Sequence, residues 1–152
     1  MPKRPLPRIY CDVHIKPGAI EAFTEVGFKC IRIPESKYRG TDEHDFFRGL
    51  YAENALLATG DEKFTQHARE NNIRHAGILE IRQDLDNANA NWAADGLAQV
   101  AKVHIQQLGK HALRRHILYF DNAGLRITDD KGDDELYKSW EAIHVDLGTP
   151  YY

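Results

Sequence analysis

Three aspartates of this 152-residue chain stand beside apolar segments, at positions where they could share one cation. Asp12 comes directly after the apolar run 9–11. Asp61 comes shortly after the apolar run 55–58, and Asp42 opens a helix-like segment before that run. Carboxylates gathered in one cleft repel one another unless a cation lies between them. Oxygen ligands alone favour Mg²⁺ or Mn²⁺ over Zn²⁺, and a water bound to such an ion can attack a phosphodiester. These residues are therefore candidates for metal-dependent phosphodiester hydrolysis.

Other side chains near these aspartates could assist the same chemistry. Glu43, next to Asp42, is a further candidate metal ligand, and Thr59 could orient a carboxylate or a water from behind the ligands. His14 lies two residues after Asp12, where it could act as a general acid, contact phosphate or simply belong to a loop. The basic residues expected to rim the cleft and hold phosphates are Lys16, Lys37, Arg39 and Arg48.

Each aspartate also has a purely structural interpretation. Thr41 suits the N-cap of the helix that follows it, so Asp42 could be an ordinary acid of that helix's first turn. Asp61, after Gly60, could be the N-cap of its own helix. Asp12 could simply end its strand. Residue type and spacing alone leave these alternatives open.

The segments that must position these side chains alternate between two patterns. Short apolar runs closed by Gly, Pro or polar residues are typical of buried parallel strands, whereas apolar residues three or four positions apart are typical of amphipathic helices. Strands are expected over 9–11, 28–33, 55–58 and 76–81. Three helices are expected between them. The first carries Ile20, Phe23 and Val26 and stops at Gly27, the second runs from Thr41 to Asn54, and the third runs from Glu62 to Asn71. This alternation predicts an α/β fold with a mostly parallel sheet and helices on both faces. Asp12 and Asp61 would then meet at the carboxyl edge of neighbouring strands, where ligands bind in such sheets.

The second half of the chain has a less regular pattern. A polar loop is expected over 83–91, a long helix over 93–108, and a hairpin with arms 115–120 and 125–128. The helical spacing of Leu136, Trp140 and Ile143 predicts a short helix in the tail.

Composition narrows the class of protein. A hydrophobic share of 42% and a charged share of 28% are ordinary for a globular protein, and this length predicts one domain with a substantial core. The net charge of −3 gives no overall attraction to nucleic acid, so RNA binding would need a local basic patch. Cys11 and Cys30 lie in apolar runs, which favours buried reduced thiols over a disulfide. Because no apolar run approaches about 20 residues and no signal-peptide pattern follows the N-terminus, a cytoplasmic protein without membrane contact is expected.

The order of these motifs resembles the PIN-like nuclease superfamily, in particular its small bacterial branch often found beside toxin–antitoxin genes. That pattern has an Asp that closes the first strand, a Ser/Thr-Asp-Glu step that opens a middle helix, and an apolar strand that runs into Thr-x-Asp-x-x-Phe. The matching residues here are Asp12, Thr41-Asp42-Glu43 and Thr59-Gly60-Asp61-Glu62-Lys63-Phe64. The strand 77–81 and the hairpin around 124–127 also fit, so the resemblance covers about residues 8 to 128.

The resemblance implies a three-layer α/β/α sandwich with a mostly parallel central sheet over residues 1–128. Residues 129–152 would then be an extension packed on the same domain, which adds a tail to the C-terminal hairpin. It also implies a Mg²⁺- or Mn²⁺-dependent ribonuclease in which Asp12, Asp42 and Asp61 hold the ion. Members are often the toxin of a toxin–antitoxin pair and often dimeric, so RNA, an antitoxin protein and a second copy of the chain are the implied partners.

The chain departs from the pattern of this branch at three places. Val13-His14 stands where the branch commonly has Glu-Asn, and Gly60 and Lys63 stand where it often has an Arg and a second Asp. Lys63 could neutralise the site or contact phosphate. A catalytically weak or inactive PIN-like module that binds RNA or a protein partner is therefore the alternative function.

A phosphatase is a weaker interpretation of the same strand-end acids. Haloacid-dehalogenase-like phosphatases also place Asp at strand ends. They need a second Asp two residues after the first as general acid, and this chain has His14 there. Hydrolysis of a small phosphomonoester, rather than of RNA, would favour this class.

Overall fold

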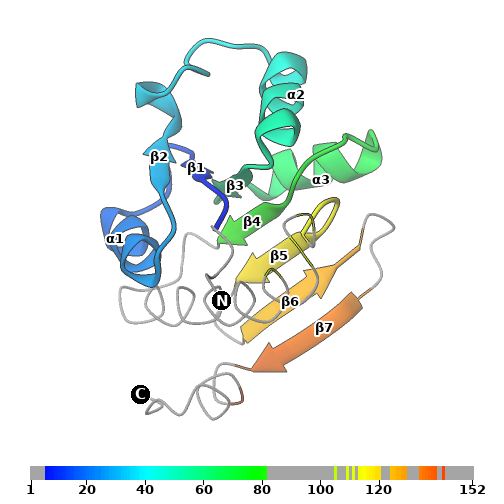
Figure 1. Cartoon of the computed structure of the whole chain (residues 1–152). Coiled ribbons are helices and arrows are strands. Elements are labelled where there is room, and N and C mark those ends of the chain that lie inside the picture. The colour runs from blue at the N-terminus through cyan, green and yellow to red at the C-terminus, as the bar shows by residue number, and fades with distance from the viewer. Residues whose placement is uncertain are drawn as a thin grey trace.

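Seven strands and three α-helices make up the part of the chain that the structure describes (Figure 1). This computed structural model describes residues 6–81, 113–120, 124–129 and 134–139, together with residues 105, 109, 111 and 142. The elements in chain order are β1 (Ile9–Cys11), α1 (Pro17–Val26), β2 (Cys30–Arg32), the 3₁₀ helix η1 (Ile33–Glu35), α2 (Glu43–Glu53), β3 (Leu56–Thr59), α3 (Glu62–Glu70), β4 (Ile78–Ile81), β5 (Ile117–Phe120), β6 (Gly124–Thr128) and β7 (Asp134–Ser139).

The strands form one mostly parallel sheet in the order β2-β1-β3-β4-β5-β6-β7. All neighbours from β2 to β5 are parallel, and β6 and β7 continue the sheet in antiparallel pairs. The predicted α/β class, mostly parallel sheet and late hairpin are confirmed. β1 lies between β2 and β3, with Cys11 opposite Ala58. At their shared carboxyl edge the chain leaves β1 toward β2 and leaves β3 toward β4, in opposite directions. Such a reversal of strand order opens a crevice for a ligand.

Each face of the sheet is covered by its own set of helices because side chains alternate along the buried strands. On one face, Ile9 and Cys11 pack with Phe23 of α1. On the other face, Tyr10 packs with Phe46 of α2 in a cluster that also holds residues of α3. Where they are described, the helices and sheet therefore form three layers. The rings of Phe47 and Phe64 stack with centroids 5.4 Å apart, which joins α2 directly to α3.

The ends of the helices show why these segments stop and start where they do. α1 ends at Gly27, whose φ of 117° belongs to the left-handed region that favours glycine. α2 ends at Asn54 as predicted, with φ of 57°. Its N-cap is Asp42 rather than the predicted Thr41, because the Asp42 carboxylate accepts a hydrogen bond from the Asp45 backbone N–H at 2.9 Å.

The first part of the tail differs from its prediction. Residue 136 belongs to strand β7, which pairs with β6, and not to a helix. Residue 142 is helical, and the other predicted helix positions, 140 and 143, lie outside the described residues. β6 would otherwise present an unpaired edge of backbone N–H and C=O groups, and pairing with β7 satisfies them. The loop predicted over 83–91 lies outside the described residues. So does the helix predicted over 93–108 except for Ile105, which is buried.

Two further expectations can be compared with the described residues. Cys11 is a buried free thiol and Cys30 is a half-buried one. The thiol contact with Cys30, together with burial, raises the pKa of Cys11, and the same contact lowers the pKa of Cys30. None of the described helices has the length and apolar character needed to cross a membrane.

Candidate active site

A pocket of about 430 Å³ opens where β1 and β3 end. Its walls come from the ends of these two strands, the segment between η1 and α2, and the first turns of α2 and α3. Its polar lining residues are Asp12, His14, Tyr38, Thr41, Glu43, Thr59 and Asp61. The fold thus brings together acids that are far apart in the sequence.

Thr59 connects the two strand-end aspartates. Its hydroxyl donates a hydrogen bond to Asp12 Oδ2 and accepts one from the Asp61 backbone N–H at 3.1 Å. Asp12 Oδ1 accepts from the His14 backbone N–H at 2.8 Å, so both oxygens of Asp12 have fixed partners. Thr59 is only 2% exposed, because it ends a strand that is buried throughout. The buried hydroxyl therefore orients the Asp12 carboxylate relative to the backbone at Asp61.

Asp61 caps a helix and also lines the pocket. It is the N-cap of α3, as one of its two interpretations predicted, and its Oδ1 accepts from the Lys63 backbone N–H at 3.0 Å. The Lys63 side chain is exposed and is not among the lining residues.

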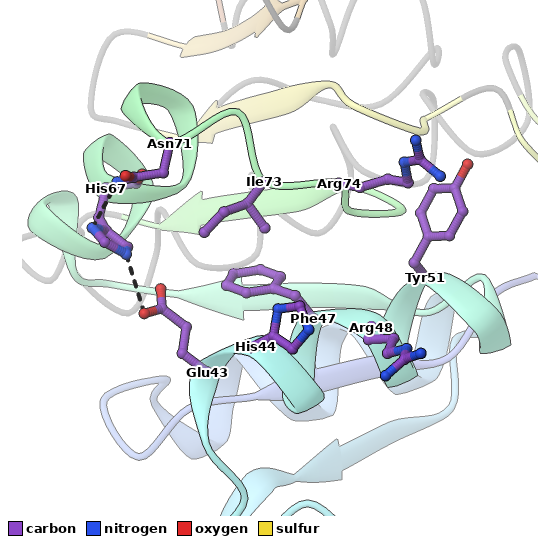
Figure 2. Close-up of a pocket in the computed structure, with 9 residues that line it drawn as sticks. All are labelled: Glu43, His44, Phe47, Arg48, Tyr51, His67, Asn71, Ile73 and Arg74. Atoms are coloured by element: carbon purple, nitrogen blue, oxygen red, sulfur yellow. Dashed lines mark hydrogen bonds and ion pairs between the residues drawn. The ribbon is translucent and has the colours of Figure 1, made fainter.

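Glu43 reaches the pocket from the first turn of α2 and is held by a short chain of polar contacts. His67 Nε2 lies 3.1 Å from Glu43 Oε2, and Asn71 Nδ2 lies 3.0 Å from His67 Nδ1 (Figure 2). Because an amide nitrogen only donates, His67 Nδ1 accepts, and the ring proton belongs on Nε2, where it faces the carboxylate. Asn71 and His67 therefore fix one oxygen of Glu43.

The other oxygen of Glu43 has no partner. Oε1 is shielded from solvent, although the side chain as a whole is 39% exposed, and no described residue donates to it. A buried carboxylate oxygen without a donor is costly in free energy. Glu43 lines the same pocket as Asp12 and Asp61, and carboxylate oxygens are the ligands that a hard cation prefers.

The structure does not bring Asp42 to this pocket. Its carboxylate caps α2, it is exposed, and it is not among the lining residues. Asp12, Asp61 and Glu43 are thus the acids of the pocket. Over the described ranges, no three or more His, Cys, Asp and Glu side chains already form a cluster that could hold a metal ion.

The predicted basic rim also has a different arrangement. None of Lys16, Lys37, Arg39, Arg48 and Lys63 lines the pocket. Lys37 instead forms an ion pair with Glu53 at 3.1 Å, at the far end of α2. Arg48 lies in a neighbouring groove described below.

A tyrosine pair and an acid support the wall of the pocket. Glu53 accepts hydrogen bonds from the hydroxyls of Tyr38 and Tyr10, the latter at 2.9 Å. Burial alone would raise the pKa of Glu53, but hydrogen bonds from Tyr38, Lys37 and Tyr10 outweigh it and lower this pKa. Burial and the contact with Glu53 raise the pKa of both tyrosines. Tyr38 is thereby fixed as a neutral wall of the pocket.

Sequence reasoning missed His67, Asn71 and Tyr38. A signal for the first two existed, because His67 and Asn71 have the i, i+4 spacing of neighbours on one helix face. Right-handed crossovers would also place consecutive helices α2 and α3 on the same face of the sheet. Tyr38 lies in a polar loop, and nothing in its spacing pointed to the pocket.

Comparison of the chain with protein-family models, with curated proteins and with solved structures finds no match.

Proposed function

We propose that the chain is a metal-dependent endoribonuclease of the PIN-like type. Asp12, Asp61 and Glu43 would hold a Mg²⁺ or Mn²⁺ ion. The observation that carries the proposal is the convergence of two strand-end aspartates and the unpaired Oε1 of Glu43 on one pocket at the switch point of the sheet. Asp42 has the role of a helix cap in this proposal.

Some residues of the pocket would hold the ion, and others orient the carboxylates that hold it. Thr59 orients Asp12, and His67 keeps Oε2 of Glu43 occupied, which leaves Oε1 as the oxygen that would bind the ion. His14 lines the pocket, where its exposed ring could contact a phosphate oxygen or protonate a leaving oxygen. A bound divalent ion would supply charge neutralisation for the phosphoryl group and an activated water.

The PIN-like assignment draws its support from the order of the motifs and from the strand-end acids. The parallel sheet with helices on both faces is compatible with it. The role of toxin, the antitoxin partner and the homodimer are proposed on the resemblance alone.

Cleavage of single-stranded RNA tests the proposal. The wild type is expected to cleave in Mn²⁺ or Mg²⁺ and to stop in EDTA. Asp61→Asn should keep the cap of α3, since Asn caps about as well as Asp, yet lose at least about 100-fold in rate because it removes a metal-ligand charge. The matched control is Asp42→Asn, which makes the same change at a cap outside the pocket and should leave the rate near that of the wild type. Equal rates for both variants and the wild type would overturn the proposal.

The second candidate is a PIN-like module that binds RNA or a protein without cleavage. The observation in its favour is that both oxygens of Asp12 and one of Asp61 already accept hydrogen bonds within the protein. This candidate predicts retention of RNA, or of a partner, with no cleavage product in any divalent metal.

A further inference from the structure

A second and larger hollow adjoins the candidate active site. It has a volume of about 690 Å³ and lies between α2, α3 and the segment that leads from α3 to β4 (Figure 2). We call it the α2–α3 groove, and its main lining residues are Glu43, Phe47, Arg48, Tyr51, Ile73 and Arg74. Glu43 lines both hollows, so the groove and the pocket that holds Asp12 and Asp61 share a wall at this residue.

The groove carries guanidinium groups whose donors are available. Arg48 is exposed and has no hydrogen-bond or ion-pair partner among the described residues. The guanidinium of Arg74 lies 5.7 Å from the centroid of the Tyr51 ring and contacts it through the ring face rather than through its N–H groups. Figure 2 shows Arg48 and Tyr51 on α2, with Arg74 across from Tyr51 on the other wall. A guanidinium with unused donors matches the planar, paired oxygens of a phosphate.

Tyr51 holds a second arginine as well. Arg114 lies 4.2 Å from the centroid of the same ring and donates to the Tyr51 hydroxyl at 3.3 Å. Its Nε is buried and has no partner among the described residues. Tyr51 thus contacts two cations: Arg74 lines the groove, and Arg114 lies beside it in another hollow, which it lines together with Arg8 and Glu53.

The charge of the groove contrasts with that of the whole chain. The net charge is −3, yet the groove lining contains Arg48 and Arg74, and its one carboxylate, Glu43, already contacts His67. Its floor is apolar at Phe47 and Ile73. This is the local basic patch that an acidic protein needs if it binds nucleic acid.

We propose that the α2–α3 groove binds the strand of single-stranded RNA that runs on from the phosphodiester in the pocket. The inference rests on the proposed function, because the RNA path starts from a reacting phosphate placed beside Asp12 and Asp61. Arg48 and Arg74 contact backbone phosphates, and the apolar floor lies under the sugars and bases. From Glu43 to Tyr51 the helix rises about 12 Å, enough for a short segment of the strand. An acidic peptide of a partner protein would suit the arginines too, but RNA also accounts for the position of the groove, which shares Glu43 with the pocket.

Binding of a fluorescein-labelled oligouridylate, followed by fluorescence anisotropy in EDTA, separates binding from cleavage. The variant R48Q/R74Q is expected to raise Kd at least about tenfold. It should also reduce the slope of log Kd against log salt by about 1.4, which is two phosphate contacts on a single strand. The control K29Q/R69Q removes the same charge from exposed positions outside the groove and should change Kd less than R48Q/R74Q by a wide margin. The single variant Arg48→Gln alters a side chain with no described partner, so it tests the groove with the fold intact.

Three outcomes would overturn this inference. The first is equal RNA affinity for R48Q/R74Q, Arg48→Gln and the wild type. The second is an equal loss in K29Q/R69Q, which would show a response to net charge alone. The third is displacement of the RNA by a polyglutamate peptide at lower concentration than by unlabelled oligouridylate.

The failure of the groove and the failure of the nuclease can be told apart. If metal-dependent cleavage is present but R48Q/R74Q cleaves with the wild-type KM, the proposal that the groove binds RNA is wrong, and the proposal of a nuclease is supported. If no divalent metal supports cleavage but R48Q/R74Q loses RNA binding, the groove is supported as an RNA-binding site and the proposed nuclease function is wrong.

Discussion

At the scale of single residues, the candidate site depends on how a few polar atoms are paired. Thr59 donates to Asp12 and accepts from the Asp61 backbone, while Asn71 and His67 fix one oxygen of Glu43. Each of these contacts leaves a carboxylate with a defined direction. Loss of an outer partner of this kind typically lowers metal affinity or activity about 10- to 100-fold.

Thr59→Val should show how much the hydroxyl of Thr59 contributes to RNA cleavage and to stability. The variant keeps the shape of the side chain but leaves Asp12 Oδ2 and the Asp61 N–H without their partner, so RNA cleavage should fall about 10- to 100-fold. The free energy of unfolding should fall by about 1–3 kcal/mol. Thr59→Ser keeps the hydroxyl and should retain most of the activity. Metal-dependent cleavage and urea unfolding measure the two effects, and a fully active Thr59→Val would show that the hydroxyl does not position the acids.

At the scale of elements, the start of α2 decides which acid faces the pocket. A helix that begins one residue later than predicted turns Asp42 into the cap and directs Glu43, in the first turn, to the pocket. The sequence motif Thr41-Asp42-Glu43 is compatible with either start, because Thr and Asp are both good N-caps.

Asp42→Ala separates the cap from the site. Loss of the cap is expected to lower the free energy of unfolding by about 1 kcal/mol, whereas Asp42→Asn should leave it nearly unchanged. Both variants should keep the Mn²⁺ affinity of the wild type, measured by calorimetric titration of the folded protein. A large loss of Mn²⁺ affinity in Asp42→Asn would return Asp42 to the set of metal ligands.

Most helices and strands could be predicted from the sequence, but the side-chain contacts between them could not. Apolar runs located β1, β3 and β4, and the spacing of Ile20, Phe23 and Val26 located α1, because burial on one or both faces leaves a clear periodic signal. The contact of His67 with Glu43 depends on the packing of α2 against α3, which no local pattern encodes. Helical spacing was misleading at Leu136, because the open edge of β6 pairs with β7 as a strand there.

At the scale of the whole molecule, a network around Glu53 joins the sheet, the loop before α2 and the end of α2. Glu53 is 18% exposed and accepts from Tyr10 of β1 and Tyr38 of the loop, while Lys37 pairs with it. It therefore connects these three segments through one carboxylate.

The stability of the protein should depend on pH through Glu53. The pKa of Glu53 is lowered in the folded state, so its stabilising effect is present above the ordinary value of 4.5 and is lost as the pH falls through the folded value. Glu53→Gln should cost about 1–3 kcal/mol of unfolding free energy near neutral pH, and the difference from the wild type should shrink in acid. Glu25→Gln, at an exposed position of α1, is the control. Urea unfolding over a pH series measures the effect, and a pH-independent difference would contradict it.

The overall topology brings the site together, since β1 and β3 are neighbours at the switch point of the sheet. A crystal soaked in Mn²⁺ and examined for anomalous scattering tests the central claim most directly. The account predicts one peak in the pocket, bounded by the carboxylates of Asp12 and Asp61 and by Oε1 of Glu43. A saturated crystal with no peak there, or with its peak at Asp42, would contradict it.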